Sequence, residues 1–155
     1  MEFTPEHVHV MINHFPLVGL VVGMGLLLVA GILKQRPVIG AALWVIALCA
    51  GMTFLVAMTG DKAADRMFDS LDKGSQKWMG EHAERAEKME KACYLLAVLA
   101  VAGYFIRRLQ PKSETWIVWI FVILTGATLV GNWWVADAGG KIRHPEFREH
   151  VSGRK

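Results

Sequence analysis

The chain has 155 residues, of which 54% are hydrophobic and 20% charged, and its formal net charge is +3. Its Lys and Arg residues are scattered among Asp and Glu without a basic run, which argues against nucleic acid as a partner. The apolar residues form long blocks between polar connections, a pattern typical of an integral membrane protein. Residues 1–155 are therefore expected to form a single transmembrane domain.

Four apolar blocks predict four membrane-spanning helices, at about residues 8–34, 38–60, 78–109 and 114–138. A helix needs about 20 mostly apolar residues to cross a bilayer. The first, second and fourth blocks meet this length by themselves. The third block is shorter, and the strong helix formers before it predict a long helix that protrudes from the membrane.

The connections between the blocks predict an all-α, antiparallel four-helix bundle. Residues 34–37 and 107–114 are short links, and short links force the helices that they join to lie side by side in opposite directions. The link between the second and third helices is longer. Within it, residues 63–71 are expected to form a short amphipathic helix, and Gly74 and Ser75 to break the pattern.

The orientation follows from the basic residues near the helix ends. The N-terminal segment lacks the positive charges and the cleavage site of a signal peptide, so the first helix is expected to be retained. Lys34 and Arg36 follow this helix, and Arg107, Arg108 and Lys112 lie in the last link. The positive-inside rule then places these two links in the cytoplasm and both termini outside.

The histidines all fall on one face of the expected bundle, the face that carries the termini. They are His7, His9, His14, His82, His144 and His150. Imidazole is a common ligand of transition metals and of haem iron, and helical bundles build cofactor sites from side chains on facing helices. This segregation predicts a haem or metal site near one membrane face.

Two arginines accompany the histidines. Arg85 lies one turn after His82, and Arg143 adjoins His144. A guanidinium group pairs bidentately with a carboxylate, so either arginine would suit a haem propionate. Ordinary anchoring at the membrane interface is an equally good interpretation of both. The glycines of the helices also have two interpretations, because small residues either let helices approach closely or leave room for a porphyrin.

The residues leave the chemistry of the site open. A copper or zinc ion held by three or four of the histidines is as sensible as haem. A third interpretation is an accessory subunit whose histidines face the headgroups and bind no cofactor. Neither HExxH, nor paired CxxC motifs, nor a nucleophile elbow is found in the sequence, so an electron carrier is favoured over an enzyme.

Four stretches carry a resemblance to a family of small bacterial inner-membrane proteins. They are HVHVMINHFPLVG, TGDKAADR, EHAERAEK and GGKIRHPEF. The resemblance spans nearly the whole chain, with each motif at the same helix boundary as in the family. The TGE-like element of the family reads TGD here, with Asp61 at the acidic position. The chain is also distantly similar to a four-helix membrane domain found fused to Rieske-type iron–sulfur proteins, which implies redox work.

The resemblance implies a bacterial inner-membrane location, with both termini in the periplasm, and a set of ligands. The motif histidines are His9, His14, His82 and His144. They would serve one or two b-type haems, and bis-histidine ligation suits electron transfer because it leaves no open iron position. The expected function is a b-type cytochrome-like electron carrier that exchanges electrons with quinone or a periplasmic redox protein. Small residues in the helices would also allow a homodimer.

Overall fold

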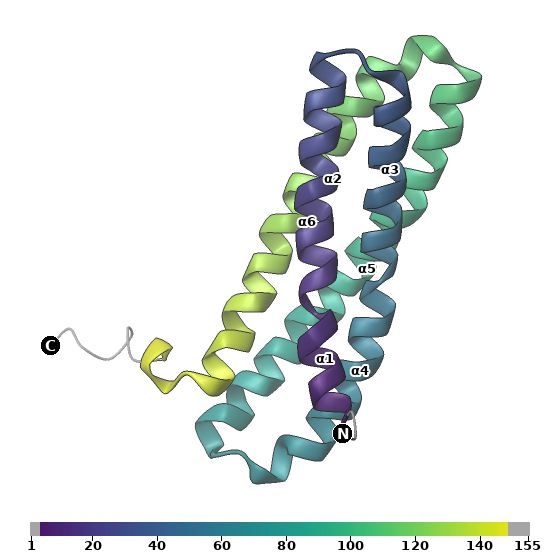
Figure 1. Cartoon of the computed structure of the whole chain (residues 1–155). Coiled ribbons are helices and arrows are strands. Elements are labelled where there is room, and N and C mark those ends of the chain that lie inside the picture. The colour runs from purple at the N-terminus through teal and green to yellow at the C-terminus, as the bar shows by residue number, and fades with distance from the viewer. Residues whose placement is uncertain (1–3, 149–155) are drawn as a thin grey trace, which may run out of the picture.

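The computed structural model describes residues 4–148, which are helical apart from short turns. The α-helices are α1 (Pro5–Ile12), α2 (His14–Ile32), α3 (Arg36–Gly51), α4 (Thr53–Met67), α5 (Lys73–Leu109) and α6 (Glu114–Arg143). The 3₁₀ turns are η1 (Phe68–Ser70), η2 (Pro111–Ser113) and η3 (Pro145–Phe147). Figure 1 shows an antiparallel bundle in which α1 begins and α6 ends at the same end. The predicted all-α four-helix bundle is confirmed for the described residues.

Two of the four rods of the bundle are broken into two helices. The α1–α2 rod breaks at Asn13, and Pro16 explains this break because its ring lacks an N–H and collides with the carbonyl four residues earlier. The α3–α4 rod breaks at Met52, next to Gly51. The four rods Pro5–Ile32, Arg36–Ser70, Lys73–Leu109 and Pro111–Arg143 are each long and apolar enough to cross a membrane.

The link between the second and third rods is shorter than predicted. The separate helix expected at residues 63–71 is instead the end of α4, which continues to Met67 and closes with η1. The expected break at Gly74 and Ser75 is also wrong, because both residues lie in the first turn of α5. The cause is Asp72, whose Oδ1 accepts the backbone N–H groups of Gly74 and Ser75 at 2.8 and 3.0 Å and so caps the helix.

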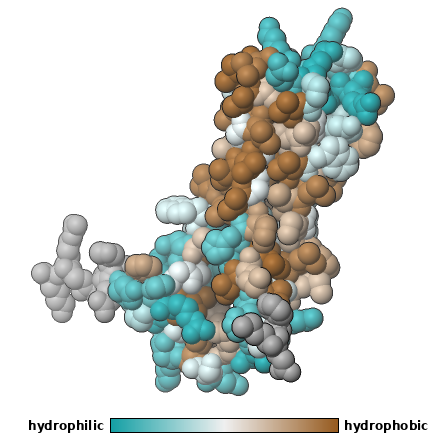
Figure 2. Space-filling view, in the orientation of Figure 1, coloured by the Kyte–Doolittle hydropathy of each residue, from teal (hydrophilic) through white to brown (hydrophobic). Residues whose placement is uncertain are grey.

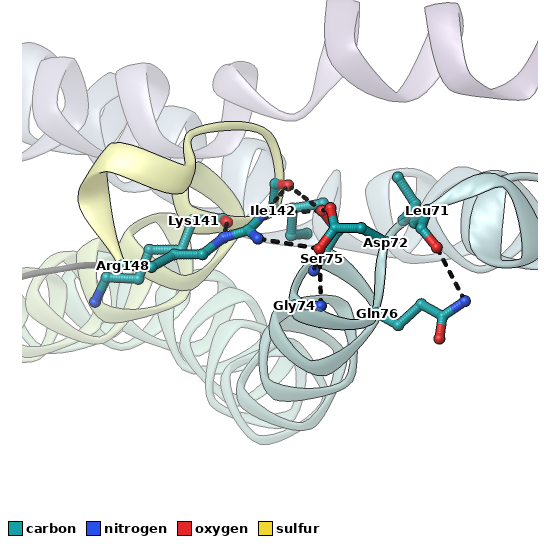
Figure 3. Close-up of polar contacts among 8 residues, drawn as sticks. All are labelled: Leu71, Asp72, Gly74, Ser75, Gln76, Lys141, Ile142 and Arg148. Atoms are coloured by element: carbon teal, nitrogen blue, oxygen red, sulfur yellow. Dashed lines mark hydrogen bonds and ion pairs between the residues drawn. The ribbon is translucent and has the colours of Figure 1, made fainter. Parts of the chain in front are cut away.

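The start of α5 is fastened to the end of α6 (Figure 3). The hydroxyl of the buried Ser75 lies 2.9 Å from the Ile142 carbonyl oxygen and contacts the Asp72 carboxylate. Arg148 donates from Nε to the Lys141 carbonyl and from Nη2 to the Ile142 carbonyl, both at 2.6 Å. These contacts satisfy carbonyls that have no partner at a helix C-terminus, and they hold the histidine-bearing end of the α5–α6 hairpin together.

Asp72 gives this corner a dependence on pH. The hydrogen bond from the Ser75 hydroxyl, assisted by backbone N–H groups, lowers the pKa of Asp72 from 3.8 to about 2. A depressed carboxyl pKa stabilises the fold above the unfolded value and loses this effect as the pH falls towards the folded value. We expect Asp72→Ala to lower the thermal midpoint by about 3 °C at neutral pH, a difference that shrinks between pH 4 and pH 2.

The control for this prediction is Asp72→Asn, which keeps a capping oxygen but does not titrate. Circular dichroism melts of the three proteins across that pH range measure the effect. A difference between wild type and Asp72→Ala that stays constant down to pH 2 would contradict the assigned capping role.

The hydrophobic core lies where α2, α3, α5 and α6 meet. Leu20, Leu27, Leu43 and Ile46 are fully buried there. Gly103 is needed for the close approach of α5 to α6, because a Cβ at this position would lie 2.6 Å from the Phe121 ring. The tightly packed half of the bundle is therefore the half away from the histidines.

The outer surface of the bundle middle is also apolar. Large hydrophobic side chains point outwards from all four rods, and Val98, Ile123 and Val130 are each about two-thirds exposed, at 66%, 68% and 67%. Figure 2 shows a brown hydrophobic zone below a polar cap at the upper end, and a more polar lower end. Such a zone, bounded by polar ends, is the surface expected of a helical bundle that sits in lipid.

Candidate functional site

The lower half of the bundle consists of the open ends of two helical hairpins. The first hairpin runs from α1 to α4 and places α1 beside α4, and the second consists of α5 and α6. In each hairpin the two helices pack against one another, and α4 also contacts α5. In contrast, α1 makes little contact with α6, although α2 packs against it higher up. Figure 1 shows α6 running away from α1 towards the lower end. The histidines thus lie in the half of the bundle where its two hairpins separate.

His9 of α1 is held against α4. Its Nδ1 lies 3.1 Å from the Val56 carbonyl oxygen and 3.4 Å from the Thr59 hydroxyl. The ring lies over Gly60, where a Cβ would come within 3.0 Å of the imidazole Cε1. Gly60 therefore provides the space that the ring occupies, and the Val56 carbonyl fixes its orientation.

His82 of α5 is held against α6 in the same way. Its Nδ1 lies 3.0 Å from the Val135 carbonyl oxygen. The ring lies over Gly139, where a Cβ would come within 3.1 Å of Cε1 and Nδ1. In both hairpins the histidine thus lies on the first helix, and the carbonyl and the glycine that fit it lie on the second.

The two hydrogen bonds fix the tautomer of both rings. A backbone carbonyl can only accept, so Nδ1 carries the proton in His9 and in His82, and the neutral ring then presents an unprotonated Nε2. This is the tautomer of metal-ligating histidines, which commonly donate their other N–H to a carbonyl or a carboxylate. The two rings form a pair of preoriented nitrogen donors.

An internal sequence repeat underlies this symmetry. Residues 56–62 read VAMTGDK and residues 135–141 read VADAGGK, with Val, Ala, Gly and Lys at the same positions. In each copy the Val carbonyl accepts from a histidine, and the Gly four residues later makes room for its ring. Sequence reasoning missed Gly60 and Gly139 as site residues, although comparing the two segments would have found them.

Arg85 places a positive charge next to His82. Its side chain is only 15% exposed, and its guanidinium carbon lies 4.7 Å from the Trp134 ring centre. One terminal nitrogen, Nη1, donates to the Trp134 carbonyl at 3.0 Å and lies 3.5 Å from Asp137. The Nε atom is buried, and no atom of the described residues accepts its hydrogen. The terminal nitrogens of Arg85 are thus paired with Glu81 at 3.8 Å and with Asp137, and its Nε keeps one unpaired hydrogen beside the histidine.

The other candidate residues do not share this arrangement. His14 is exposed at the start of α2. His144 is exposed, lies 2.8 Å from Glu146 through Nδ1, and stacks on Phe147. Arg143 is exposed, with Nη2 3.8 Å from the Met67 sulfur. His150 lies outside the described residues.

The structure thus gives His9 and His82 equivalent settings, with Arg85 one turn after His82, and the roles predicted for these residues and for His14, His144 and Arg143 stay predictions. Among residues 4–148 no three His, Cys, Asp or Glu side chains come together in a way that could hold a metal ion. The arrangement that the described residues offer is a pair of histidines.

Polar side chains lie beside Cys93, which is itself part of the hydrophobic core. The Asn132 amide nitrogen of α6 lies 3.7 Å from the Cys93 sulfur of α5, and Thr53 lies beside Cys93 at the start of α4. The side-chain oxygens of Asn13 and Thr53 are buried, and within the described residues neither has a hydrogen-bond partner.

No protein-family model, curated protein or solved structure matches the chain. The resemblance to small bacterial inner-membrane proteins therefore stays a prediction. The basis for inferring a function is the paired geometry of His9 and His82 in four helices that are able to span a membrane.

Proposed function

We propose that the protein is a b-type cytochrome-like electron carrier of a bacterial inner membrane, with His9 and His82 as the axial ligands of a haem near one membrane face. The observation that carries this proposal is the matched pair of imidazoles. Each hairpin supplies one, each is oriented through Nδ1 by a backbone carbonyl, and each has an unprotonated Nε2. A bound haem would supply a one-electron redox centre.

The residues around the pair fit such a group. The absence of a side chain at Gly60 and Gly139 leaves space for the two imidazole rings. These two glycines would therefore accommodate the ligands rather than the porphyrin. The buried Nε of Arg85 has a hydrogen to donate, and a haem propionate is a carboxylate of the kind that arginine binds. Trp134 and Trp78, with ring centres 4.7 and 5.9 Å from the guanidinium carbon, hold Arg85 in place.

The number of histidines favours haem over a polyhistidine copper or zinc site. A zinc or copper centre in a protein needs three or four ligands, whereas the axial positions of a low-spin haem need two. If both histidines held the iron of a haem, oxygen would find no open position there, which would suit a carrier rather than an oxygen-using enzyme. Quinone and a periplasmic redox protein are the partners that this location and this chemistry imply.

The experiment that tests the proposal is an absorption spectrum of the detergent-purified protein, before and after reduction with dithionite. We expect a Soret band and sharp α and β bands on reduction, which identify low-spin b-type haem. A pyridine haemochrome assay should then give one haem per chain. A colourless protein from cells supplied with ample haem would overturn the proposal, and elemental analysis for copper and zinc would then be the next measurement.

A further inference from the structure

A second candidate site lies at the end of the bundle opposite the histidines. A cavity of about 370 Å³ opens there between the end of α2, the start of α6 and the link from α2 to α3. Its wall includes the apolar side chains Leu28, Ile32, Val118 and Trp119 and the cationic side chains Lys34 and Arg36. Ile32 and Trp119 are also exposed, by 71% and 50%. The cavity is therefore continuous with the apolar outer surface on one side and basic on the other.

Lys34 has a backbone conformation that its residue type does not favour. Helix α2 ends in a Schellman motif, in which the Gln35 N–H donates to the Ala30 carbonyl at 2.8 Å. Lys34 occupies the left-handed position of this motif with a φ of 54°, and it is the one non-glycine residue of the described chain with a positive φ. Glycine is the usual residue at this position. A lysine kept in a strained conformation points to a use for its side chain.

The charges around the cavity leave an excess of positive charge. Glu114 is the acidic residue of its wall, and two arginines already pair with it: Arg107 Nη2 at 2.9 Å and Arg36 Nε at 3.1 Å. Within residues 4–148, Lys34 has no acidic partner within ion-pair distance. The rim of the cavity can therefore neutralise an additional anion.

We propose that this cavity binds an anionic phospholipid. Lys34 and Arg36 hold the headgroup phosphate, and the acyl chains lie along Leu28, Ile32 and Trp119. Basic pockets between transmembrane helices are suited to anionic headgroups, and Trp prefers the headgroup level of the bilayer. The inference requires that the helices span a membrane, and it is independent of haem binding at the other end.

Native mass spectrometry of the purified protein tests this site, with phosphatidylglycerol and phosphatidylcholine of identical acyl chains as probes. We expect the wild type to retain phosphatidylglycerol about fivefold better, and Lys34→Gly to lose this preference. Lys34→Gly suits the left-handed position and should fold at least as well as the wild type, which a circular dichroism melt checks. Lys112→Gln, which removes a charge from the same end but outside the cavity, should keep the preference.

Three outcomes would overturn the proposal. The first is equal retention of the two lipids by the wild type, and the second is an unchanged preference in Lys34→Gly. The third is displacement of bound phosphatidylglycerol by millimolar inorganic phosphate, because that would show a free anion site without a role for the acyl chains.

Discussion

Replacing either His9 or His82 with Ala is expected to abolish haem binding. Each variant removes one of the two imidazoles that we propose as haem ligands and that a backbone carbonyl holds in the Nδ1-protonated tautomer. The reduced-minus-oxidised spectrum of the purified variants should lack the sharp α band, and haem per chain should fall at least about tenfold. The loss should not reflect unfolding, because both carbonyls belong to helices and keep their own partners.

Two controls separate ligation from a structural effect. His7→Ala removes an exposed histidine outside the predicted ligand set from the same end of the bundle and should retain the spectrum. Millimolar imidazole added to His82→Ala should restore a low-spin spectrum by replacing the missing donor, which a purely structural role would not allow. Full haem occupancy in either His9→Ala or His82→Ala would refute the ligand assignment. Loss of haem in His14→Ala would bring that histidine back as a ligand.

The substitutions Gly139→Ala and Gly60→Ala are each expected to weaken haem binding about tenfold. Losses of affinity of this size are typical when a residue that orients a ligand is changed. A Cβ at Gly139 would lie 3.1 Å from the His82 ring, and one at Gly60 would lie 3.0 Å from the His9 ring. The imidazoles must then shift by a few tenths of an ångström, and we expect this shift to disturb their contacts with the carbonyl oxygens. Haem titration of the purified variants, followed at the Soret band, measures the change.

Neighbouring glycines provide matched controls for this prediction. A Cβ at Gly140 would meet only Phe147, at an ordinary 3.9 Å, and one at Gly51 would meet nothing within 4 Å. Gly140→Ala and Gly51→Ala should therefore bind haem as the wild type does, while gaining the same helix propensity. If all four substitutions had the same effect on haem affinity, helix flexibility rather than space for the rings would be the cause.

The four rods could be predicted because each carries a long apolar block and two of the links are short. The ends of the helices were harder to predict around residues 61–78, where α4 ends and α5 begins. There Gly74 and Ser75 have the composition of a break, but the capping carboxylate of Asp72 makes them the first turn of α5. A side-chain cap outweighs the weak helix propensity of such residues, and sequence composition alone does not reveal which of the two effects prevails.

The candidate site was predictable only in part. The gathering of histidines at one end follows from the topology, and with it His9 and His82. The pairing of these two could not be predicted from ligand spacing, because the partner of each ring is a backbone carbonyl, which any residue type supplies. The last helix extends to Arg143 and leaves the side chains of Arg143 and His144 exposed, and the roles predicted for these two residues stay predictions.

The repeated hairpin has a consequence for the symmetry of the molecule. Both copies begin at the same end, so the axis that relates them runs along the bundle. A ligand on this axis would meet chemically equivalent imidazoles from its two sides. The equivalence ends three residues after the histidines, where one copy has Ile12 and the other has Arg85. A bound molecule with one acidic edge would therefore enter this nearly twofold site in a single orientation, with that edge towards α5 and α6.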